Sequence, residues 1–405
     1  MIASIREFLK METASGIVLM AAAILALIAA NSPFQYIYEQ LLTVKLTVAV
    51  ESFAISKPLL LWVNDGLMAV FFLLVGLELK REAIEGELSS PQKVALPALG
   101  AVGGMAVPAA VYAYLNFHDP VAIQGWAIPT ATDIAFALGI LILLGDRVPS
   151  ALKIFLVSLA IFDDLGAIIV IALFYTDNLS LSALAVSGGC LVLLAVMNRL
   201  NVVSKAAYLV VGLVMWVALL KSGVHATLAG VALALFIPMS GIDWEGESHH
   251  PLKELEHDLH GMVGFLILPV FAFCNAGLSF EGLSMMDVFN PISLGIILGL
   301  FFGKQVGVMF MVWLGIKLKL GAMPKGVSWA HMYGVAVLCG VGFTMSLFIG
   351  GLAFAQTGED NFAQDRLGIL LGSLISGVWA VIWLKYFSPP VKESAQQAAD
   401  NNNPS

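Results

Sequence analysis

The sequence contains 405 residues, of which 59% are hydrophobic and only 12% are charged. This mix is far from that of a soluble globular chain, and it predicts an all-α protein that crosses a membrane many times. The net charge of −8 includes an acidic loop and a polar tail, so it does not indicate a nucleic-acid partner. The three cysteines lie in apolar runs without a paired spacing, so neither disulfides nor a zinc site is predicted.

Apolar stretches long enough to span a bilayer predict twelve transmembrane helices within residues 1–387. They cover residues 12–31, 59–85, 95–116, 121–144, 151–175, 181–199, 205–220, 223–240, 256–279, 290–315, 327–352 and 363–385. The first is longer than the core of a signal peptide, so we interpret it as an uncleaved span. Alternating residues within 33–58 predict a small β-hairpin outside the membrane, and residues 388–405 have too little apolar surface to fold, which predicts a disordered tail.

The lysines and arginines indicate the orientation of the chain. With the N-terminus inside, fifteen of the twenty basic residues face the cytoplasm, whereas Lys45, Lys57, Lys221 and Arg366 face out. This asymmetry predicts an even number of spans with both termini in the cytoplasm. One basic residue, Lys304, is left in the middle of the tenth span.

Asp163 and Asp164 are adjacent carboxylates inside the apolar run of residues 154–175. Each acid near the centre of a spanning helix costs at least a few kcal/mol, so such residues indicate a functional site. The alternative is a structural acid that is hydrogen-bonded to a neighbouring helix or placed in an aqueous mouth.

Two predicted spans contain helix breakers in their middles. The fourth has Pro129 and Thr132 before Asp133, and the eleventh has Gly340 and Gly342. Proline removes a backbone donor and paired glycines loosen the hydrogen-bond ladder. Unwound backbone at membrane depth is tolerated only where protein or a wet cavity covers it. An ordinary kink or a close helix contact remains the alternative for each break.

Each broken span has one span before it and one after it, which suggests two three-span units, residues 95–175 and 290–385. Six segments then carry a resemblance: Asn64–Glu78 (NDGLMAVFFLLVGLE), Pro129–Phe136 (PTATDIAF), Phe162–Gly166 (FDDLG), Ser222–Thr227 (SGVHAT), Leu255–His260 (LEHDLH) and Gly340–Ser346 (GVGFTMS). In this order and spacing they resemble the NhaA family of bacterial sodium/proton antiporters, a standard example of inverted repeats with broken helices. The resemblance implies two inverted three-helix repeats, two crossing broken helices, a bacterial inner membrane, and a homodimer formed through residues 45–58.

The aspartate pair suits competition between a cation and protons. Na⁺ and Li⁺ are hard cations that prefer oxygen ligands, and Asp163 and Asp164 could hold either ion only when ionised. Burial and mutual repulsion favour the protonated acids, so protons compete for the same oxygens and the pair titrates as a unit. Consecutive residues on a helix point about 100° apart, so one acid can face the ion while the other faces a partner. Lys304 is the obvious partner.

The resemblance implies a role for each of these residues. Asp164 would be a principal cation ligand, and Asp163 would bind or relay protons and pair with Lys304. Asp133, with Thr132, would sit where the broken helices cross, and Asp133 and Lys304 would offset the partial charges of the half-helix ends there. A purely structural role for Lys304 remains open. The resemblance also implies exchange of two protons for one Na⁺, which moves net charge.

A second cluster lies at the cytoplasmic ends of two spans, at helical spacing: Glu78, Arg81 and Glu82 on the second, and Lys253, Glu256, His257 and His260 on the ninth. Histidine is the side chain that most readily changes charge between pH 5 and 8. The resemblance implies a pH sensor here that activates transport at alkaline pH, and His225 is a further candidate. Solvated helix ends with surface ion pairs are the alternative.

Together these features predict a secondary antiporter rather than an enzyme, with Na⁺, Li⁺, H⁺ and membrane lipid as partners and no cofactor. A nucleotide-binding motif is absent from the sequence, which argues against transport driven by ATP hydrolysis. One rival is an intramembrane aspartyl protease that uses Asp133 with Asp163 or Asp164, but its Gly-x-Gly-Asp signature is absent. Another is a cation channel, which would pass Na⁺ without obligatory proton exchange.

Overall fold

The computed structural model describes residues 2–50, 53–86, 91–176, 179–242, 246–355 and 359–389, and the chain there is mostly helical. Its elements are α1 (Ile2–Ala30), α2 (Gln35–Thr43), β1 (Lys45–Val50), β2 (Phe53–Pro58), α3 (Leu59–Trp62), η1 (Val63–Leu67), α4 (Met68–Ile84), α5 (Pro91–Asn116), η3 (Ala122–Thr130), α6 (Ile134–Leu143), η4 (Gly145–Arg147), α7 (Ser150–Phe174), α8 (Leu181–Arg199), α9 (Lys205–Leu220), α10 (Leu228–Phe236), β3 (Gly241–Ile242), β4 (Ser248–His249), α11 (Pro251–Met262), η5 (Val263–Ile267), α12 (Leu268–Asn275), η6 (Asp287–Phe289), α13 (Pro291–Leu298), η7 (Gly299–Gly303), α14 (Lys304–Lys317), α15 (Trp329–Leu338), α16 (Phe343–Ala353) and α17 (Glu359–Tyr386).

Within the described residues, eight helices are long and apolar enough to cross a membrane, and the number rises to ten if each of two bent pairs is one span. Each of the twelve predicted stretches contains helix. However, α9 has only sixteen residues and α10 only nine. Because a straight crossing needs about twenty residues, eight to ten crossings are shown and the predicted twelve are not confirmed. The predicted tail, residues 388–405, lies outside the described residues except for Ser388 and Pro389.

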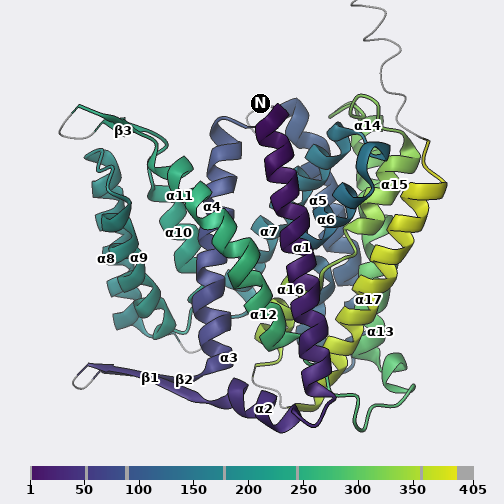
Figure 1. Ribbon diagram of the computed structural model, residues 1–405, viewed down its shortest axis with the longest axis horizontal. Coiled ribbons are helices and arrows are strands. Elements are labelled where there is room, and N and C mark those ends of the chain that lie inside the picture. The colour runs from purple at the N-terminus through teal and green to yellow at the C-terminus, as the bar shows by residue number, and fades with distance from the viewer. Residues whose placement is uncertain are drawn as a thin grey trace, which may run out of the picture.

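The small β-hairpin predicted within residues 33–58 is confirmed. Strands β1 and β2 pair antiparallel, with Lys45 opposite Pro58 and Val50 opposite Phe53. Figure 1 shows the hairpin at the end of the helical bundle opposite to the N-terminus. A second, two-residue pairing of β3 with β4 was not predicted, and it lies near the other end of the bundle.

Both described ends of the chain lie at one end of the bundle: α1 begins there and α17 finishes there (Figure 1). The chain therefore makes an even number of passes through the bundle. Helices α8 and α9 form one lateral edge, and α13 and α17 lie at the opposite edge.

Helices α5 and α14 approach each other closely at two glycines. A Cβ atom on Gly103 would collide with the carbonyl oxygen of Gly307, and a Cβ atom on Gly307 would collide with that of Gly103. Small residues that let two backbones meet are typical of helix contacts inside membranes. This contact holds α14, which carries Lys304, against α5.

Candidate functional site

Two broken helices meet in the interior of the bundle. The first breaks at residues 131–133, between η3 and α6, and the second at residues 339–342, between α15 and α16. The breaks are joined directly, because the Asp133 backbone N–H donates to the Val341 carbonyl at 2.7 Å. The Thr132 hydroxyl also lies 3.0 Å from the Cys339 carbonyl oxygen. Four helix ends therefore gather around this point.

Asp133 lies between two helix N-termini. Its Oδ1 accepts from the Phe136 backbone N–H at 3.0 Å, which caps α6. Its Oδ2 accepts from the Thr344 backbone N–H at 3.0 Å and from the Thr344 hydroxyl at 2.6 Å, at the start of α16. A carboxylate satisfies the unpaired N–H groups at such ends and is attracted by their partial positive charge. Asp133 is 1% exposed.

Lys304 provides the opposite charge at the same crossing. Its Nζ donates to the Thr130 carbonyl at 2.5 Å, to the Thr132 hydroxyl at 3.0 Å and to Asp163 Oδ2 at 2.6 Å. Thr130 is the last residue of η3, so the ammonium group lies at a helix C-terminus, where partial negative charge gathers. The lysine follows η7, a π-helical turn, and its side chain is completely buried.

The two adjacent aspartates of α7 have different surroundings. Asp163 Oδ2 accepts from Lys304 and, at 2.6 Å, from the Thr132 hydroxyl. Asp163 Oδ1 and Asp164 Oδ1 are both buried and have no hydrogen-bond partner among the residues that the structure describes. Leaving a buried polar atom without a partner is costly, so such atoms mark places where a proton or an ion can bind. In the same described residues, no third His, Cys, Asp or Glu joins the pair in a metal-binding group.

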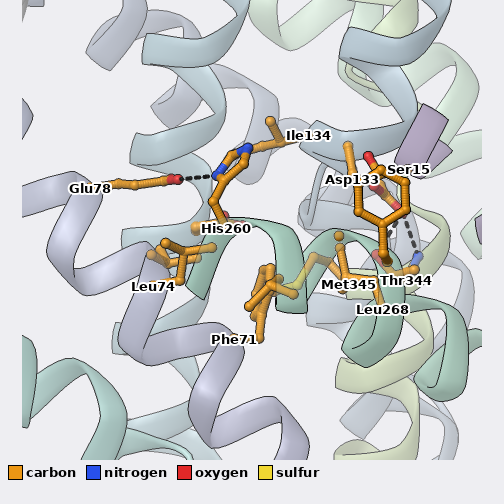
Figure 2. Close-up of a pocket in the computed structure, with 16 residues that line it drawn as sticks. Ser15, Phe71, Leu74, Glu78, Asp133, Ile134, His260, Leu268, Thr344 and Met345 are labelled. Carbon is orange, nitrogen blue, oxygen red and sulfur yellow. Dashed lines mark hydrogen bonds and ion pairs between the residues drawn. The ribbon is translucent and has the colours of Figure 1, made fainter. Parts of the chain in front are cut away.

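Asp164 and Asp133 both line one cavity of about 80 Å³. The cavity also touches Thr344, and on its other side it reaches Glu78 of α4 and His260 of α11 (Figure 2). The Glu78 and His260 side chains are 25% and 23% exposed, whereas Asp164 is 1% exposed. The cavity therefore leads from the partly exposed ends of α4 and α11 to the buried acids.

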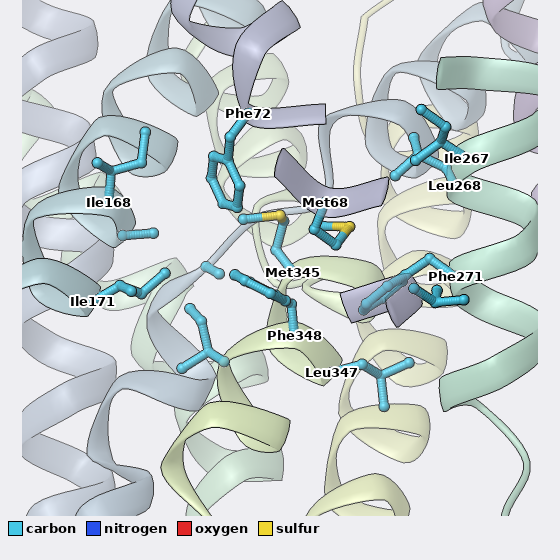
Figure 3. Packing of buried hydrophobic residues seen from close by; sticks show 14 of the residues in the cluster. Met68, Phe72, Ile168, Ile171, Ile267, Leu268, Phe271, Met345, Leu347 and Phe348 are labelled. Carbon is cyan, nitrogen blue, oxygen red and sulfur yellow. The ribbon is translucent and has the colours of Figure 1, made fainter. Parts of the chain in front are cut away.

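Apolar side chains close the cavity on the side away from Glu78. Met345 lines the cavity, and Phe348 lies beyond it on the same helix, packed against Phe72 and Phe271 (Figure 3). The ring of Phe348 lies 5.5 Å from that of Phe72 and 6.2 Å from that of Phe271, measured between centroids. All four side chains are at most 2% exposed. Densely packed apolar side chains therefore lie next to the part of the cavity that Met345 lines.

The second predicted cluster forms three contacts between α11 and the C-terminal part of α4 with its cap residue Glu85: two ion pairs and one carboxylate–histidine contact, which is ionic when His260 is protonated. They are Glu78 Oε1 to His260 Nδ1 at 3.7 Å, Arg81 Nε to Glu256 Oε2 at 2.9 Å, and Glu85 Oε2 to Lys253 Nζ at 2.6 Å. Arg81 also contacts Glu82 of its own helix at 2.8 Å. We call these three contacts the α4–α11 ladder. Its Glu78–His260 contact borders the cavity, so the ladder and the aspartates share one space.

The structure brings together most of the predicted site residues but not all of them. Thr132, Asp163 and Lys304 form one hydrogen-bonded group, and Asp164 follows Asp163 on α7. Asp133 is the chain neighbour of Thr132 and bonds to Thr344 and Val341 instead. His257 is exposed on α11, away from the cavity lining, and His225 is half-buried in the turn between α9 and α10.

Sequence reasoning placed Thr130 and Thr344 in the two breaks without a site role, and it did not identify Glu85. Thr344 carried a usable signal, because a hydroxyl residue just after paired glycines is a candidate for a helix start. Glu85 follows Glu78 by seven residues, a spacing that would place both on one face of a continuous helix, and it is the residue that caps the end of α4. The contribution of Thr130 is a backbone carbonyl, which no residue type can signal.

Comparison with known proteins gives one consistent family. A family model described as Na⁺/H⁺ antiporter 1 matches residues 6–384 of this chain. A Na⁺/H⁺ antiporter NhaA of Campylobacter concisus is 58% identical over 94% of this chain and 93% of its own length. A Na⁺/H⁺ antiporter NhaA 3 of Saccharophagus degradans is 56% identical over 94% of this chain and 96% of its own, and a Pseudomonas putida NhaA is 56% identical over 92% and 94%. The resemblance noted in the sequence is thereby confirmed, and the chain belongs to the NhaA family of Na⁺/H⁺ antiporters.

Proposed function

We propose that this protein is a secondary antiporter that exports Na⁺ or Li⁺ from a bacterial cytoplasm in exchange for protons. The observation that carries the proposal is Asp164, a buried carboxylate that lines a cavity open toward one end of the bundle. Its Oδ1 lacks a hydrogen-bond partner among the described residues. Membership of a family of Na⁺/H⁺ antiporters supports the same activity.

The exchange follows from competition at the aspartates. An alkali cation prefers oxygen ligands, and ionised Asp164 supplies them with help from nearby carbonyl, hydroxyl or water oxygens. Protonation removes the negative charge and releases the cation, so cation and proton occupy the site in turn. Ionised Asp163 forms an ion pair with Lys304. A proton that binds to Asp163 releases the Lys304 ammonium group from this pair. Two protons taken up for each Na⁺ released make the exchange electrogenic.

Asp133 and Lys304 have a second role in this proposal, which is to neutralise the helix ends where the broken spans cross. Asp133 faces two N-termini and Lys304 faces the C-terminus of η3. Buried partial charges without a counter-charge would be costly in a membrane interior. The two residues therefore keep a polar crossing stable at the depth where the cation binds.

The α4–α11 ladder is proposed as the pH sensor. At acidic pH a charged His260 attracts Glu78 across the mouth of the cavity, while Arg81 holds Glu256 beside them. Above the titration range of histidine this attraction is lost at the mouth of the cavity and Glu78 is free to admit cations, while the Arg81–Glu256 and Lys253–Glu85 pairs keep α4 and α11 together. The exposed position of His257 makes it a weaker candidate than His260. His225, distant in the chain from this ladder, would act separately at the opposite face of the membrane.

The remaining features of the proposal concern the whole chain. We infer twelve passes, in which the short α9 and α10 each count as one, with inverted repeats over residues 95–175 and 290–385. Both termini face the cytoplasm, because most lysines and arginines lie at that end. The protein is a homodimer in the inner membrane, joined through the hairpin of residues 45–58.

The test uses inside-out vesicles from cells that lack other antiporters, acidified by respiration and followed with a pH-sensitive dye. We expect Na⁺ and Li⁺, but not K⁺, to dissipate the proton gradient, and we expect Asp164→Asn to abolish this response. The thermal unfolding midpoint of Asp164→Asn should stay at or above the wild-type value, because the substitution removes a buried charge. Full sodium-dependent exchange in Asp164→Asn would exclude its role as ligand. Na⁺ flux without proton movement would instead indicate a channel.

A further inference from the structure

A second, larger groove lies away from the aspartates, on the outside of α5, α7 and α14. It has a volume of about 810 Å³ and is bounded by the first turns of α5 and α7, the end of α14 and the loop of residues 319–324. Most of its lining is apolar, including Leu96 of α5, Phe155 of α7 and Ile316 of α14. It shares no lining residue with the cavity that reaches Asp164.

The groove is accessible from outside the bundle. Two of its lining residues, Ile154 and Leu320, are 48% and 50% exposed. In a membrane protein, exposed apolar side chains of this kind meet hydrocarbon rather than water. An apolar hollow that opens to the side of the bundle therefore takes up a flexible apolar chain from the bilayer more readily than it takes up water.

A basic segment borders the groove. Residues 316–327 contain Lys317, Lys319 and Lys325 and no acidic residue. Lys319 itself lines the groove, and Lys317 lies over the Trp313 ring, 4.7 Å from its centroid. Basic pockets at the cytoplasmic ends of membrane helices bind anionic lipid headgroups. The positive charge of this segment therefore favours binding of a negatively charged partner.

Lys319 also has an unusual backbone conformation. Its φ angle is 58°, a left-handed value that costs most side chains energy and that glycine usually adopts after a helix. The turn closes α14, because the Leu320 N–H donates to the Gly315 carbonyl at 2.9 Å. The chain thus has a lysine at a position whose backbone conformation suits glycine, and this lysine lines the groove.

We propose that this groove binds one anionic phospholipid of the cytoplasmic leaflet, with an acyl chain along the apolar walls and the phosphate at Lys319 and Lys325. The proposal depends on the orientation given above and not on the exchange reaction. The lipid would contact α7, which carries Asp163 and Asp164, and α14, which carries Lys304. It would therefore join the two helices that hold the ion pair.

The test is a lipid titration of the purified full-length protein, followed by native mass spectrometry, with phosphatidylglycerol and phosphatidylcholine of equal chain length. We expect tighter binding of phosphatidylglycerol. In Lys319→Gln/Lys325→Gln its Kd should rise about 5- to 30-fold, since each lysine near an anionic lipid contributes roughly a fivefold gain in affinity. The weak binding of phosphatidylcholine should not change.

Two further variants separate the groove from general surface charge. Ala322→Trp places a large ring in the groove and should abolish binding of both lipids at this site. Lys205→Gln removes a lysine of α9 that pairs with Glu254 and Asp258, and it should bind phosphatidylglycerol as the wild type does. All variants should keep the wild-type thermal unfolding midpoint in detergent without added lipid.

The proposal is overturned if Lys319→Gln/Lys325→Gln or Ala322→Trp keeps wild-type affinity for phosphatidylglycerol. It is also overturned if soluble glycerol phosphate displaces the lipid completely at millimolar concentration, because the site would then recognise a free phosphate alone. Exchange activity is not the readout, so failure of the lipid proposal leaves the antiport proposal untouched.

Discussion

Individual residues at the crossing differ in how fully their polar atoms are satisfied. Asp133 accepts three hydrogen bonds, and the Lys304 ammonium group makes three contacts. Asp164, by contrast, has a buried oxygen with no partner in the described part of the chain. The satisfied groups are suited to hold the crossing together, and the unsatisfied one is suited to exchange its occupant.

Loss of one member of the buried ion pair should be severe. In Lys304→Ala, Asp163 would keep a buried charge without its partner, and removing one partner of a buried pair costs about 3–5 kcal/mol. We expect a clear fall in the thermal unfolding midpoint. The measurement is the fluorescence of the purified protein as it is heated. Adding Asp163→Asn should recover part of the loss, because the orphaned charge is then gone. The control is Lys57→Ala, whose partly exposed pair with Asp65 should contribute at most about 1 kcal/mol. An equal fall in the unfolding midpoint of Lys304→Ala and Lys57→Ala would contradict the expectation that the buried pair contributes more to stability than the partly exposed one.

Helices come together here through small residues and through charge. The α5–α14 contact leaves no room for a methyl group at Gly103 or Gly307. The α4–α11 ladder instead joins two partly exposed helix ends with ionic contacts. The first contact is fixed by shape, and the second is the one that we propose to respond to pH.

The close contact of α5 and α14 predicts intolerance of a single methyl group. In Gly307→Ala the new Cβ would meet the Gly103 carbonyl, and overpacking of this kind costs about 1–3 kcal/mol. A matched control is Gly188→Ala in α8, where a Cβ meets nothing within 4 Å and alanine favours the helix. In thermal unfolding experiments, the midpoint temperature should fall for Gly307→Ala and should not fall for Gly188→Ala. An unchanged midpoint in Gly307→Ala would mean that the helices can separate without cost.

The ladder predicts a change in the pH dependence of exchange. In His260→Gln the attraction for Glu78 at acidic pH is lost, so activity at pH 6.5 should rise relative to activity at pH 8.5. His257→Gln alters an exposed histidine of the same helix and should keep the wild-type profile. The measurement is the rate of Na⁺-driven proton movement in vesicles across this pH range. Wild-type profiles in Glu78→Cys and Glu256→Cys as well would exclude the ladder as the sensor.

At the scale of the whole molecule, the proposed exchange site and the proposed dimer contact are well separated in the fold. The hairpin projects from the end of the bundle opposite to the N-terminus (Figure 1), while the cavity opens between α4 and α11. Lys221 Nζ donates to the Ala54 carbonyl at 2.9 Å, which ties the hairpin to the end of α9.

Removal of residues 45–58 should therefore affect assembly more than exchange. We expect the shortened protein to sediment as a monomer in mild detergent, because the paired strands that we propose join two copies are gone. The Na⁺ concentration for half-maximal exchange should stay within about twofold of the wild type, since the deletion leaves the cavity lining unchanged. A dimer that persists after the deletion would show that another surface joins the subunits.

The sequence by itself determined the class of protein, the hairpin and the family. Hydrophobic length, charge asymmetry and strand alternation are local properties, and six motifs in one order are specific. It also identified the buried charged residues Asp133, Asp163, Asp164 and Lys304, because a charge in an apolar run is visible without a structure. It did not settle the number of crossings, since α9 has only sixteen residues and α10 has only nine within the predicted stretch 223–240.

Only the tertiary structure decided which groups meet. Asp133 reaches Thr344 across 211 positions in the sequence, and Lys304 reaches Asp163 across 141. It also placed His260 rather than His257 opposite Glu78, and it joined Glu78 to Asp164 through one cavity. Contacts between distant segments depend on how the helices pack, and packing is a property of the whole chain that no local pattern encodes.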